Sequence, residues 1–385
     1  AEVTPTVTSV LADHRYAAKS ADIEGIARSI ASKLGIAVDA PGGGAYDAWV
    51  TALVKDLQAH QGSSLVVAGD HQPPIVHALA HAIYEKLGNA GKTIIYTEPL
   101  EGNPVPHAES LKALIDEMNA GKVQTVIVLS GNPVYTAPSD WNFRDAYLKV
   151  PTRVHLGLFV DETAEVSHWH VPEAHTLEAW GDARAYDGTI TTIQPLIDPI
   201  YGGRSAIELI GVMLGKQTTA FQTWKRYWRD KLKIADFETQ LQKALHDGFW
   251  ANSAPAPKTV AVKGDLKSVA PSASPTGIEI TFRLDPNVLD GRFANNAWLQ
   301  ELPKPISKVT WDNALHIGPS TAEKLAVTTD DLVEIKLRGK SIQAAVWVTP
   351  GQARDTATLT IGYGRKRAGN VGSGSPGELR DWVEY

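Results

Sequence analysis

Three short polar loops contain the side chains best suited to binding a ligand. Each loop follows an apolar run with the length of a strand: Gly69-Asp70-His71-Gln72, Ser130-Gly131-Asn132-Pro133 and Asp161-Glu162-Thr163. Glycine permits a tight turn and a close approach of the backbone, and the neighbouring side chains can hydrogen-bond a ribose, a pterin or a base. The alternative is ordinary turn formation and helix capping, for which these residue types are equally suited. No glycine-rich Rossmann or P-loop motif joins a predicted strand to a helix, so a Rossmann dinucleotide site is not supported.

Two groups of histidines have spacings that suit zinc. His168 and His170 share one face of an extended segment, with His175 five residues after His170, and His77 and His81 lie at i and i+4 of a predicted helix. Neither group has a third ligand nearby with an obvious geometry, and His77 and His81 flank an apolar helical stripe. We therefore predict no metal site, and the roles of His168, His170 and His175 stay open.

No pattern predicts a catalytic residue. The carboxylates Asp330-Asp331, and Glu162 near Glu165, are explained by solvated turns or helix surfaces, and no nucleophile elbow or triad spacing is present. One basic segment, Arg365-Lys366-Arg367, follows Gly362-Tyr363-Gly364. It is suited either to gripping a phosphate or to forming an exposed loop.

The elements that must position these loops alternate between strands and helices. Strands are predicted at 64–68, 93–96, 125–129 and 154–160, and helices at 22–34, 46–59, 74–87, 108–119, 141–148, 205–214, 219–232 and 237–249. This alternation implies an α/β fold with a mostly parallel sheet and flanking helices. Because parallel strands share their carboxyl edge, we expect the three polar loops to converge there.

Composition changes after residue 250. Residues 251–277 are rich in Pro, Ala, Ser and Lys, which predicts a mobile, semi-extended linker. Beyond it, short strands at 278–283, 332–337, 341–348 and 356–361, with one helix at 320–325, predict a small closed β-barrel. The expected organisation is a helical segment at 1–62, an α/β domain at 63–250, the linker, and a barrel domain at 278–385.

Composition also excludes several classes of protein. A chain of 385 residues with 43% hydrophobic and 21% charged residues is globular and long enough for two domains. The net charge of −6 predicts no nucleic-acid partner, and no apolar run approaches the roughly 20 residues that cross a bilayer. Cysteine is absent, which excludes disulfides, thiolate-held iron–sulfur clusters and Cys-type zinc sites within these residues. Because the sequence begins Ala1-Glu2 without a Met or a signal segment, we expect the natural amino terminus to lie upstream.

Several longer strings resemble a known family. Residues 66–81, followed by the string Leu87-Gly88-Asn89-Ala90-Gly91-Lys92-Thr93, resemble the central domain of molybdopterin oxidoreductases, and the loops at 131–133 and 161–164 resemble loops that surround the pterin dinucleotide there. Residues 310–314, 319–325 and 331–335 are similar to that family's carboxy-terminal dinucleotide-binding barrel, which is of the double-psi type. Residues 169–175, 182–188, 290–296 and 298–303 resemble one branch, the iron–sulfur/molybdopterin-like subunit of the quinol-oxidising alternative complex III.

The resemblance implies a function. It implies a molybdopterin-fold part of a respiratory electron-transfer subunit, bound to other subunits on the periplasmic face of the bacterial inner membrane without direct membrane insertion. The segments that hold the molybdenum ligand and the iron–sulfur clusters in the family lie outside these residues, and this branch is thought to have lost molybdenum, so we expect a structural role without a bound cofactor. The alternatives are a module that binds the family's molybdopterin guanine dinucleotide in an active oxidoreductase, and a small-ligand-binding protein that reuses the cleft.

The resemblance also implies a set of cofactor-binding residues. If the cleft is vestigial, we expect side chains such as Trp311 or Tyr363 to fill part of it. The candidates are Gly69, Asp70, Gln72, Gly131, Asn132, Pro133, Asp161, Glu162, Thr163, Trp311, Asn313, Gly362 and Arg365.

Overall fold

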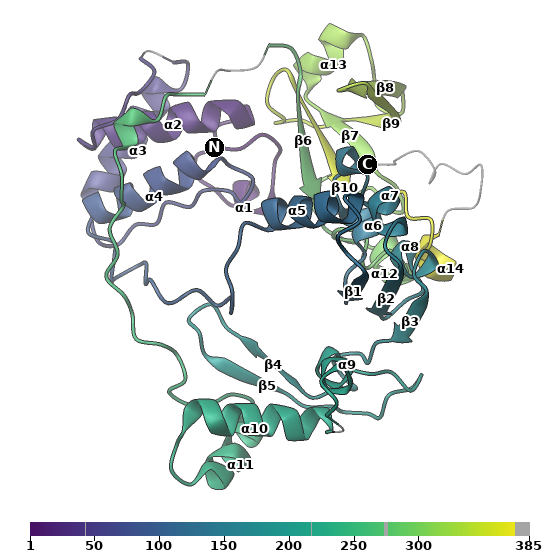
Figure 1. Cartoon of the computed structure of the whole chain (residues 1–385). Helices are drawn as coiled ribbons and strands as arrows, with labels where there is room; N and C mark the ends of the chain where they lie inside the picture. Colours follow the sequence, from purple (N-terminus) through teal and green to yellow (C-terminus); the bar gives the residue numbers. More distant parts are fainter. Residues whose placement is uncertain (43, 217, 273–275, 374–385) are drawn as a thin grey trace. The chain divides into compact units, whose positions relative to one another are not determined.

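The chain forms two compact units, and each unit is built from segments that are not consecutive in the sequence. The computed structural model describes residues 1–42, 44–216, 218–272 and 276–373 (Figure 1). Unit 1 contains Ala1–Tyr96 and Pro257–Gly364, and unit 2 contains Thr97–Ala256 and Arg365–Ser373. The helical segment at 1–62 therefore shares a unit with most of the residues expected to form a barrel. The four-part division expected from the sequence stays a prediction.

The helical part of unit 1 packs three helices around one apolar core. After the short α1 (Val7–Val10), α2 (Ser20–Lys33), α3 (Asp47–Ala59) and α4 (Pro74–Lys86) lie together (Figure 1). Apolar residues recur every three or four positions in each helix, so each helix buries one stripe. The buried core includes Ile26, Ile30, Val50, Val54, Leu79 and Ile83.

The strand part of unit 1 is one mixed sheet. Its strands are β6 (Glu279–Leu284), β7 (Ala314–Ile317), β8 (Leu332–Leu337), β9 (Lys340–Val348) and β10 (Thr356–Ile361), with the short helices α12 (Ala297–Glu301) and α13 (Pro319–Leu325). The strand order is β6-β10-β7-β9-β8, with β10–β6 and β7–β9 parallel and the other two pairs antiparallel. Glu279 of β6 accepts hydrogen bonds from the amides of Ser20 (2.8 Å) and Ala21 (3.2 Å), which joins the sheet to the start of α2.

The expected closed barrel is not what this sheet forms. Among the described residues β6 and β8 are edge strands that do not pair with each other, so the sheet stays open. Of the described strands β8 pairs with β9 alone, and its terminal residues Leu332 and Leu337 are about half exposed. An apolar cavity of about 470 Å³ is lined by residues of all five strands, among them Ile280 of β6 and Val333 of β8.

The first part of unit 2 contains the parallel sheet that the sequence predicts. β1 (Thr125–Leu129), β2 (Thr152–Gly157) and β3 (Trp169–Pro172) pair in parallel in that order. The helices α5 (His107–Asn119) and α7 (Phe143–Leu148) contribute to the core beside it, which includes Ile115, Met118, Val126 and Tyr147. The short helices α6 (Pro133–Thr136), η1 (Ser139–Trp141) and α8 (Glu162–Glu165) follow the first two strands.

Two expected strands are absent from this sheet. Residues 64–68 form no strand, and Leu65 and Val67 are exposed; residues 93–96 make only isolated bridges, Ala90 with Ile94 and Tyr96 with Lys258. Both runs belong to unit 1, where no neighbouring strand pairs with them over the described residues. A β-forming composition was insufficient because a strand also needs a partner for its backbone groups.

The second part of unit 2 is built on aromatic side chains. It contains the hairpin of β4 (Gly181–Arg184) and β5 (Ile190–Ile193), then α9 (Ala206–Met213), α10 (Ala220–Leu232) and α11 (Phe237–Asp247). Its core packs Trp224 and Trp228 of α10 with Phe237 and Trp250. The last described helix of the unit is α14 (Gly369–Gly372).

The expected linker contacts unit 1 along part of its length. Lys258 pairs with Tyr96, and Arg28 Nη2 donates to the carbonyl of Val269 at 2.9 Å, just after the turn η2 (Leu266–Ser268). Residues 273–275 of this segment lie outside the described residues, and its mobility stays a prediction. No helix in the described ranges is both long and apolar enough to cross a membrane.

Candidate functional site

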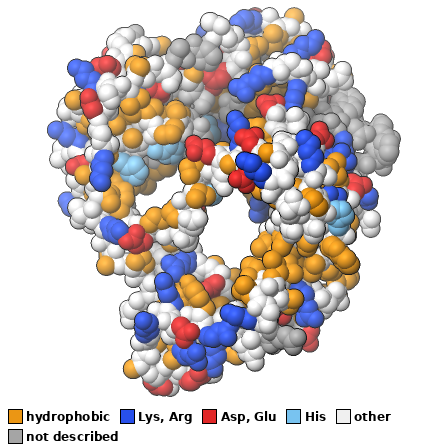
Figure 2. All heavy atoms as spheres, in the orientation of Figure 1, with side chains coloured by type: hydrophobic (Ala, Val, Ile, Leu, Met, Phe, Trp, Pro, Cys, Tyr) orange, Lys and Arg blue, Asp and Glu red, His pale blue; other side chains and the backbone are white. Residues whose placement is uncertain are grey.

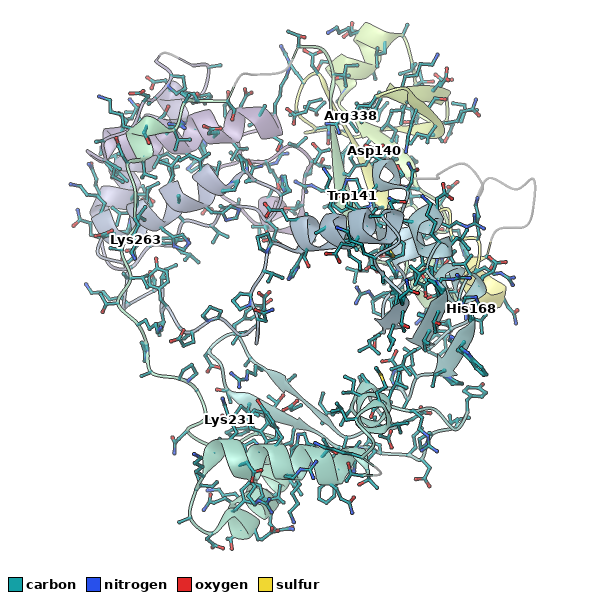
Figure 3. The ribbon with its side chains drawn as sticks, in the orientation of Figure 1. Asp140, Trp141, His168, Lys231, Lys263 and Arg338 are labelled. Carbon is teal, nitrogen blue, oxygen red and sulfur yellow. The ribbon has the colours of Figure 1, made fainter. Side chains whose placement is uncertain are left out.

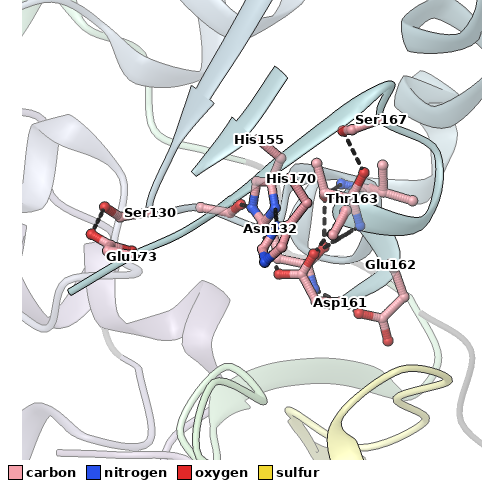
Figure 4. A network of polar contacts seen from close by, with 12 residues as sticks. Ser130, Asn132, His155, Asp161, Glu162, Thr163, Ser167, His170 and Glu173 are labelled. Atoms are coloured by element: carbon pink, nitrogen blue, oxygen red, sulfur yellow. Dashed lines mark hydrogen bonds and ion pairs between the residues drawn. The ribbon is translucent and has the colours of Figure 1, made fainter. Parts of the chain in front are cut away.

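The loops that follow β1 and β2 meet at the carboxyl edge of the parallel sheet. Asn132 accepts hydrogen bonds at Oδ1 from Thr163 N (3.2 Å) and Thr163 Oγ1 (2.7 Å), and Thr163 Oγ1 accepts from Val134 N at 3.1 Å (Figure 4). Asp161 caps α8 by accepting from the amides of Thr163 (3.0 Å) and Ala164 (2.9 Å). Two of the three polar loops predicted to converge are therefore hydrogen-bonded to each other.

Glu162 lies at the centre of this junction as a buried carboxylate. Arg365 donates from Nε to Oε1 (2.9 Å) and from Nη2 to Oε2 (2.8 Å), and both side chains are at most one tenth exposed. Two successive backbone amides, of Lys366 (2.9 Å) and Arg367 (3.0 Å), donate to Oε1, and Asn132 Nδ2 donates to Oε2 at 2.7 Å. Burial opposes ionisation, but the hydrogen bonds and charge of Arg365 outweigh it and lower the pKa of Glu162 to about 2.

The contacts around Arg365 extend the junction. Its guanidinium lies 4.9 Å from the centre of the Tyr135 ring, and Nη2 also donates to the carbonyl of Arg367 at 3.1 Å. A second, exposed pair joins Arg367 to Glu165 at 2.6 Å. Residues 365–367 are thereby fixed onto the sheet edge although they lie about 200 positions away in sequence.

A pair of histidines crosses β2 and β3 beside this junction. His155, almost fully buried, and His170 are register partners, with 3.1 Å between their Nδ1 atoms, and His155 Nε2 lies 3.0 Å from the carbonyl oxygen of Gly131. A carbonyl only accepts, so His155 donates from Nε2 to Gly131 O, and one of the two Nδ1 atoms donates to the other. Burial, and then the proximity of His155, lower the pKa of His170. The ring of His155 lies over Gly157, where any Cβ would overlap it.

Ser130 and Glu173 close the other side of the sheet edge. Ser130 has a left-handed backbone with φ of 60°, and its hydroxyl donates to the Glu173 carboxylate (Figure 4). Glu173 N in turn donates to the carbonyl of Gly157 at 3.0 Å. A second set of hydrogen bonds thus joins residues at the carboxyl ends of β1, β2 and β3.

The third predicted loop belongs to unit 1. Gln72 is buried and donates from Nε2 to Ser20 Oγ (3.0 Å) and to His71 Nε2 (3.1 Å), whereas Gly69 and Asp70 are exposed. Burial and then the charge of Arg283 lower the pKa of His71. The convergence of the loop at 69–72 with the two loops of unit 2 stays a prediction.

The candidates from the strand module of unit 1 have structural contacts. Asn313 is buried, its Oδ1 accepts from Thr360 Oγ1 at 2.7 Å, and its amide group donates to the Thr360 carbonyl. Gly362 has φ of 117° and packs against the backbone of Leu289 and Gly291, where a side chain would not fit. Trp311 is half-buried with a left-handed φ of 62°, and its amide donates to Gln300 O at 3.0 Å.

Sequence reasoning missed the buried cation of this module. Lys304 donates from Nζ to the Asp312 carbonyl (2.9 Å) and to Tyr363 Oη (2.8 Å), and it lies 3.6 Å from the buried Asp285 carboxylate. Burial lowers the pKa of Lys304 and raises that of Tyr363. A lone Lys among prolines, as in Pro303-Lys304-Pro305, gave no signal of burial. His155 was equally unrecognised, although a polar residue between Val154 and Leu156 in an apolar strand was a usable signal.

These residues do not fit a pterin dinucleotide well. Such a ligand needs donors for its phosphates and partners for its rings, yet Arg365, two backbone amides and Asn132 already bind Glu162, and the Asn313 amide binds Thr360. The polar groups at the sheet edge of unit 2 bind one another and so join the loops after β1 and β2 to residues 365–367.

Three of the other histidines singled out from the sequence take part in local hydrogen bonds. The exposed His168 (labelled in Figure 3) accepts at Nδ1 from Arg153 N at 3.1 Å, His175 Nδ1 accepts from Leu177 N at 3.2 Å, and His81 Nδ1 lies 2.9 Å from Tyr96 Oη. Within the described ranges no group of three His, Cys, Asp or Glu side chains is arranged to hold a metal ion.

Comparison with known proteins identifies a fold and no family. No family model matches the sequence, and no curated protein matches it. Among solved structures, the chain is similar to acetylene hydratase from Pelobacter acetylenicus, with a TM-score of 0.54 and 13% sequence identity over 71% of this chain and 42% of that enzyme. The chain thus spans less than half the length of that enzyme. The likeness supports a molybdopterin-oxidoreductase-like fold.

Proposed function

We propose that this chain is a structural part of a respiratory electron-transfer subunit: a molybdopterin-oxidoreductase-like scaffold of the alternative complex III type that binds no molybdopterin guanine dinucleotide. Its partners would be the other subunits of a quinol-oxidising complex on the periplasmic face of the bacterial inner membrane. The sequence resemblance to that branch, and the similarity in fold to a much longer enzyme, support this proposal.

The observation that carries the proposal is the occupation of an anion-binding arrangement by the chain's own carboxylate. A guanidinium and two successive backbone amides are the donors that proteins use to grip phosphate. Here all three are directed at Glu162, whose carboxylate takes the place of the ligand anion. In a cofactor-binding relative, such donors would remain available to the ligand; in a scaffold they fix residues 365–367 to the sheet.

The first experiment asks whether the protein binds the family's cofactor. The intact subunit should contain less than a tenth of an equivalent of molybdenum or tungsten by elemental analysis and no pterin extractable with acid and iodine. Isothermal titration with GDP, which carries the guanosine and the pyrophosphate of the dinucleotide, should give no heat of binding. Stoichiometric metal together with extractable pterin would refute the scaffold proposal in favour of an active cofactor-binding module.

The second experiment separates a structural role from a catalytic one. Glu162→Gln in the native host should lower the amount of assembled complex, because the variant loosens the junction, while quinol oxidation per assembled complex stays unchanged. Glu165→Gln, which removes the neighbouring exposed pair, is the matched control and should leave the amount of complex as in the wild type. A lower turnover per complex with normal assembly would contradict the proposal.

A further inference from the structure

The helix α9 has the composition of a buried helix but lies on the surface of unit 2. Its sequence is Ala-Ile-Glu-Leu-Ile-Gly-Val-Met, with Glu208 as the one charged residue, and Gly211 is its one buried residue. A helix that is apolar on all sides is normally enclosed by protein or lipid. Val212 is 69% exposed and Met213 is 57% exposed. α9 therefore lacks a partner for most of its apolar surface.

Neighbouring segments extend this exposed region into one apolar surface. Leu177 O accepts from Leu196 N (2.7 Å), Pro172 O from Arg204 N (2.9 Å), and Gly157 O from Glu173 N (3.0 Å), so the segments at 158–160 and 196–201 are held near the start of α9. Hydrophobic side chains gather on the face drawn in Figure 2 where Figure 1 places α9. We define the apolar surface by its large side chains, each between 44% and 87% exposed: Leu158, Phe159, Val160, Leu196, Ile197, Ile200, Tyr201, Ile210, Val212, Met213 and Leu214.

The apolar surface is larger than monomeric proteins usually expose. At these exposed fractions its side chains amount to about 1,000 Å², whereas the largest patch of a typical monomer is roughly 300–600 Å². A stable protein–protein interface buries about 800 Å² on each partner. The area thus matches one partner's share of a stable interface.

The charges at the rim favour a protein partner over an anionic membrane. Arg204 and Lys216, exposed cations, lie at the two ends of α9; Arg204 pairs with Glu208 at 3.9 Å, whereas the exposed Asp198 lies on the same surface without an ion-pair partner in the described ranges. Glu208 is engaged in capping α9, and Glu178 accepts from the amides of His175 and Ile200. A membrane-binding surface has a predominantly basic rim. A rim that carries both signs is instead self-complementary, because a two-fold axis can set Lys216 of one copy beside Asp198 of the other.

We propose that the apolar surface is the contact through which two copies of this chain associate as a symmetric dimer. Burial of α9 is the main stabilising contribution, and the rim charges set the relative orientation of the two copies. This inference is independent of the proposed function, since a dimeric protein is compatible with either a scaffold or a cofactor-binding module.

Sedimentation equilibrium of the full chain tests the dimer. The wild type should be predominantly dimeric at micromolar concentration. Val212→Asp should raise the dissociation constant at least tenfold, because it places a charge in the centre of the contact. Leu11→Asp alters a side chain of unit 1 that is 81% exposed and lies outside the apolar surface, and it should leave the dissociation constant unchanged.

Single-cysteine variants give a second readout that does not depend on a disruptive charge. Because the chain has no cysteine, Met213→Cys and Leu11→Cys each introduce one thiol. A bismaleimide cross-linker should convert Met213→Cys into a covalent dimer and leave Leu11→Cys monomeric at the same concentration. A wild type that stays monomeric up to 100-micromolar concentration, or equal cross-linking of the two variants, would overturn the proposal. So would a monomeric wild type that floats with phosphatidylcholine–phosphatidylglycerol vesicles and loses this binding in Val212→Asp, which would assign the surface to lipid.

Discussion

Replacing Glu162 by Gln should strongly destabilise unit 2 at neutral pH. Glutamine keeps the size of the side chain and one acceptor oxygen, but it removes the charge that balances the buried guanidinium of Arg365. The NH2 group of Gln would replace either Oε1, which accepts from two backbone amides, or Oε2, which accepts from Asn132, so a donor would face donors at one of the two positions.

The magnitude follows from the pKa of the buried carboxyl. Lowering the pKa of Glu162 from 4.5 to about 2 corresponds, at about 1.4 kcal/mol per unit, to about 3 kcal/mol of stabilisation by the ionised form. Removing one partner of a buried ion pair typically costs about 3–5 kcal/mol, because the remaining charge is left uncompensated. We therefore expect Glu162→Gln to lower the free energy of unfolding by about 3 kcal/mol at pH 7.

The pH dependence has a definite sign. The folded-state pKa of Glu162 is lower than the unfolded-state value, so between about 2 and 4.5 the unfolded chain binds more protons than the folded chain. The stabilisation by Glu162 is present in full above pH 4.5 and is lost as the pH falls toward about 2. The difference between wild type and Glu162→Gln should consequently shrink when the pH is lowered from 7 to 3.

Urea unfolding and hydrogen exchange measure this difference. Circular dichroism gives the unfolding free energies at pH 7, 4.5 and 3, and exchange of the amides at 163–164 reports on unit 2 itself. Glu165→Gln is the matched control, because its pair with Arg367 is about half exposed and contributes less than about 1 kcal/mol. Equal loss of stability in the two variants at pH 7, or a Glu162→Gln effect that does not depend on pH, would refute the assignment of Glu162 as the buried anchor of residues 365–367.

Two further predictions concern the buried His155 and the half-buried His316. Gly157→Ala should lower the free energy of unfolding of unit 2 by about 1–3 kcal/mol, because the new Cβ would overlap the His155 ring. In the double variant with His155→Ala, the added cost of Gly157→Ala should largely disappear. Strictly additive unfolding free energies would contradict the clash. In unit 1, burial and then the charge of Lys304 lower the pKa of His316 to about 4, so the unfolded chain binds more protons between pH 6.5 and 4 and stability falls by about 3 kcal/mol as the pH drops through that window. His316→Gln should flatten this part of the stability–pH curve, and an unchanged acid dependence would show that another group titrates there.

The sequence predicted local elements better than pairing. β1 is found at the predicted residues, and α5, α10 and β10 begin within one residue of expectation, because periodicity and turn residues are local signals. The runs at 64–68 and 93–96 have the same β-forming composition as β1, yet they form no strand. Conversely, the segment His168-Trp169-His170 was expected to be extended, but its pairing was not predicted because it has no apolar alternation. It forms β3 and pairs with β2, and the first residue of β3, Trp169, is 69% exposed.

The sequence selected the residues of this network without revealing which of them are partners. Asn132, Glu162, Thr163 and Arg365 were all selected from the sequence as cofactor-binding residues, and the structure joins the four in one network. What the sequence does not reveal is that Glu162 and Arg365, 203 positions apart, are each other's partner. A loop that binds a phosphate and a loop that binds a distant carboxylate of its own chain need the same residue types.

The identity of the bound anion therefore decides whether this edge of the parallel sheet is a phosphate-binding site or a structural contact. In unit 2 the anion is supplied by α8, and the donors come from the segment that directly follows unit 1 in the chain, so the contact also determines where the chain re-enters unit 2 after Gly364. A ligand phosphate bound by Arg365 and the two amides would have to displace Glu162, leaving a buried carboxylate without its cation. That displacement costs about as much as the ion pair contributes, about 3 kcal/mol, or roughly a hundredfold in affinity. The same contact that stabilises the fold thus disfavours the cofactor for which the edge is otherwise suited.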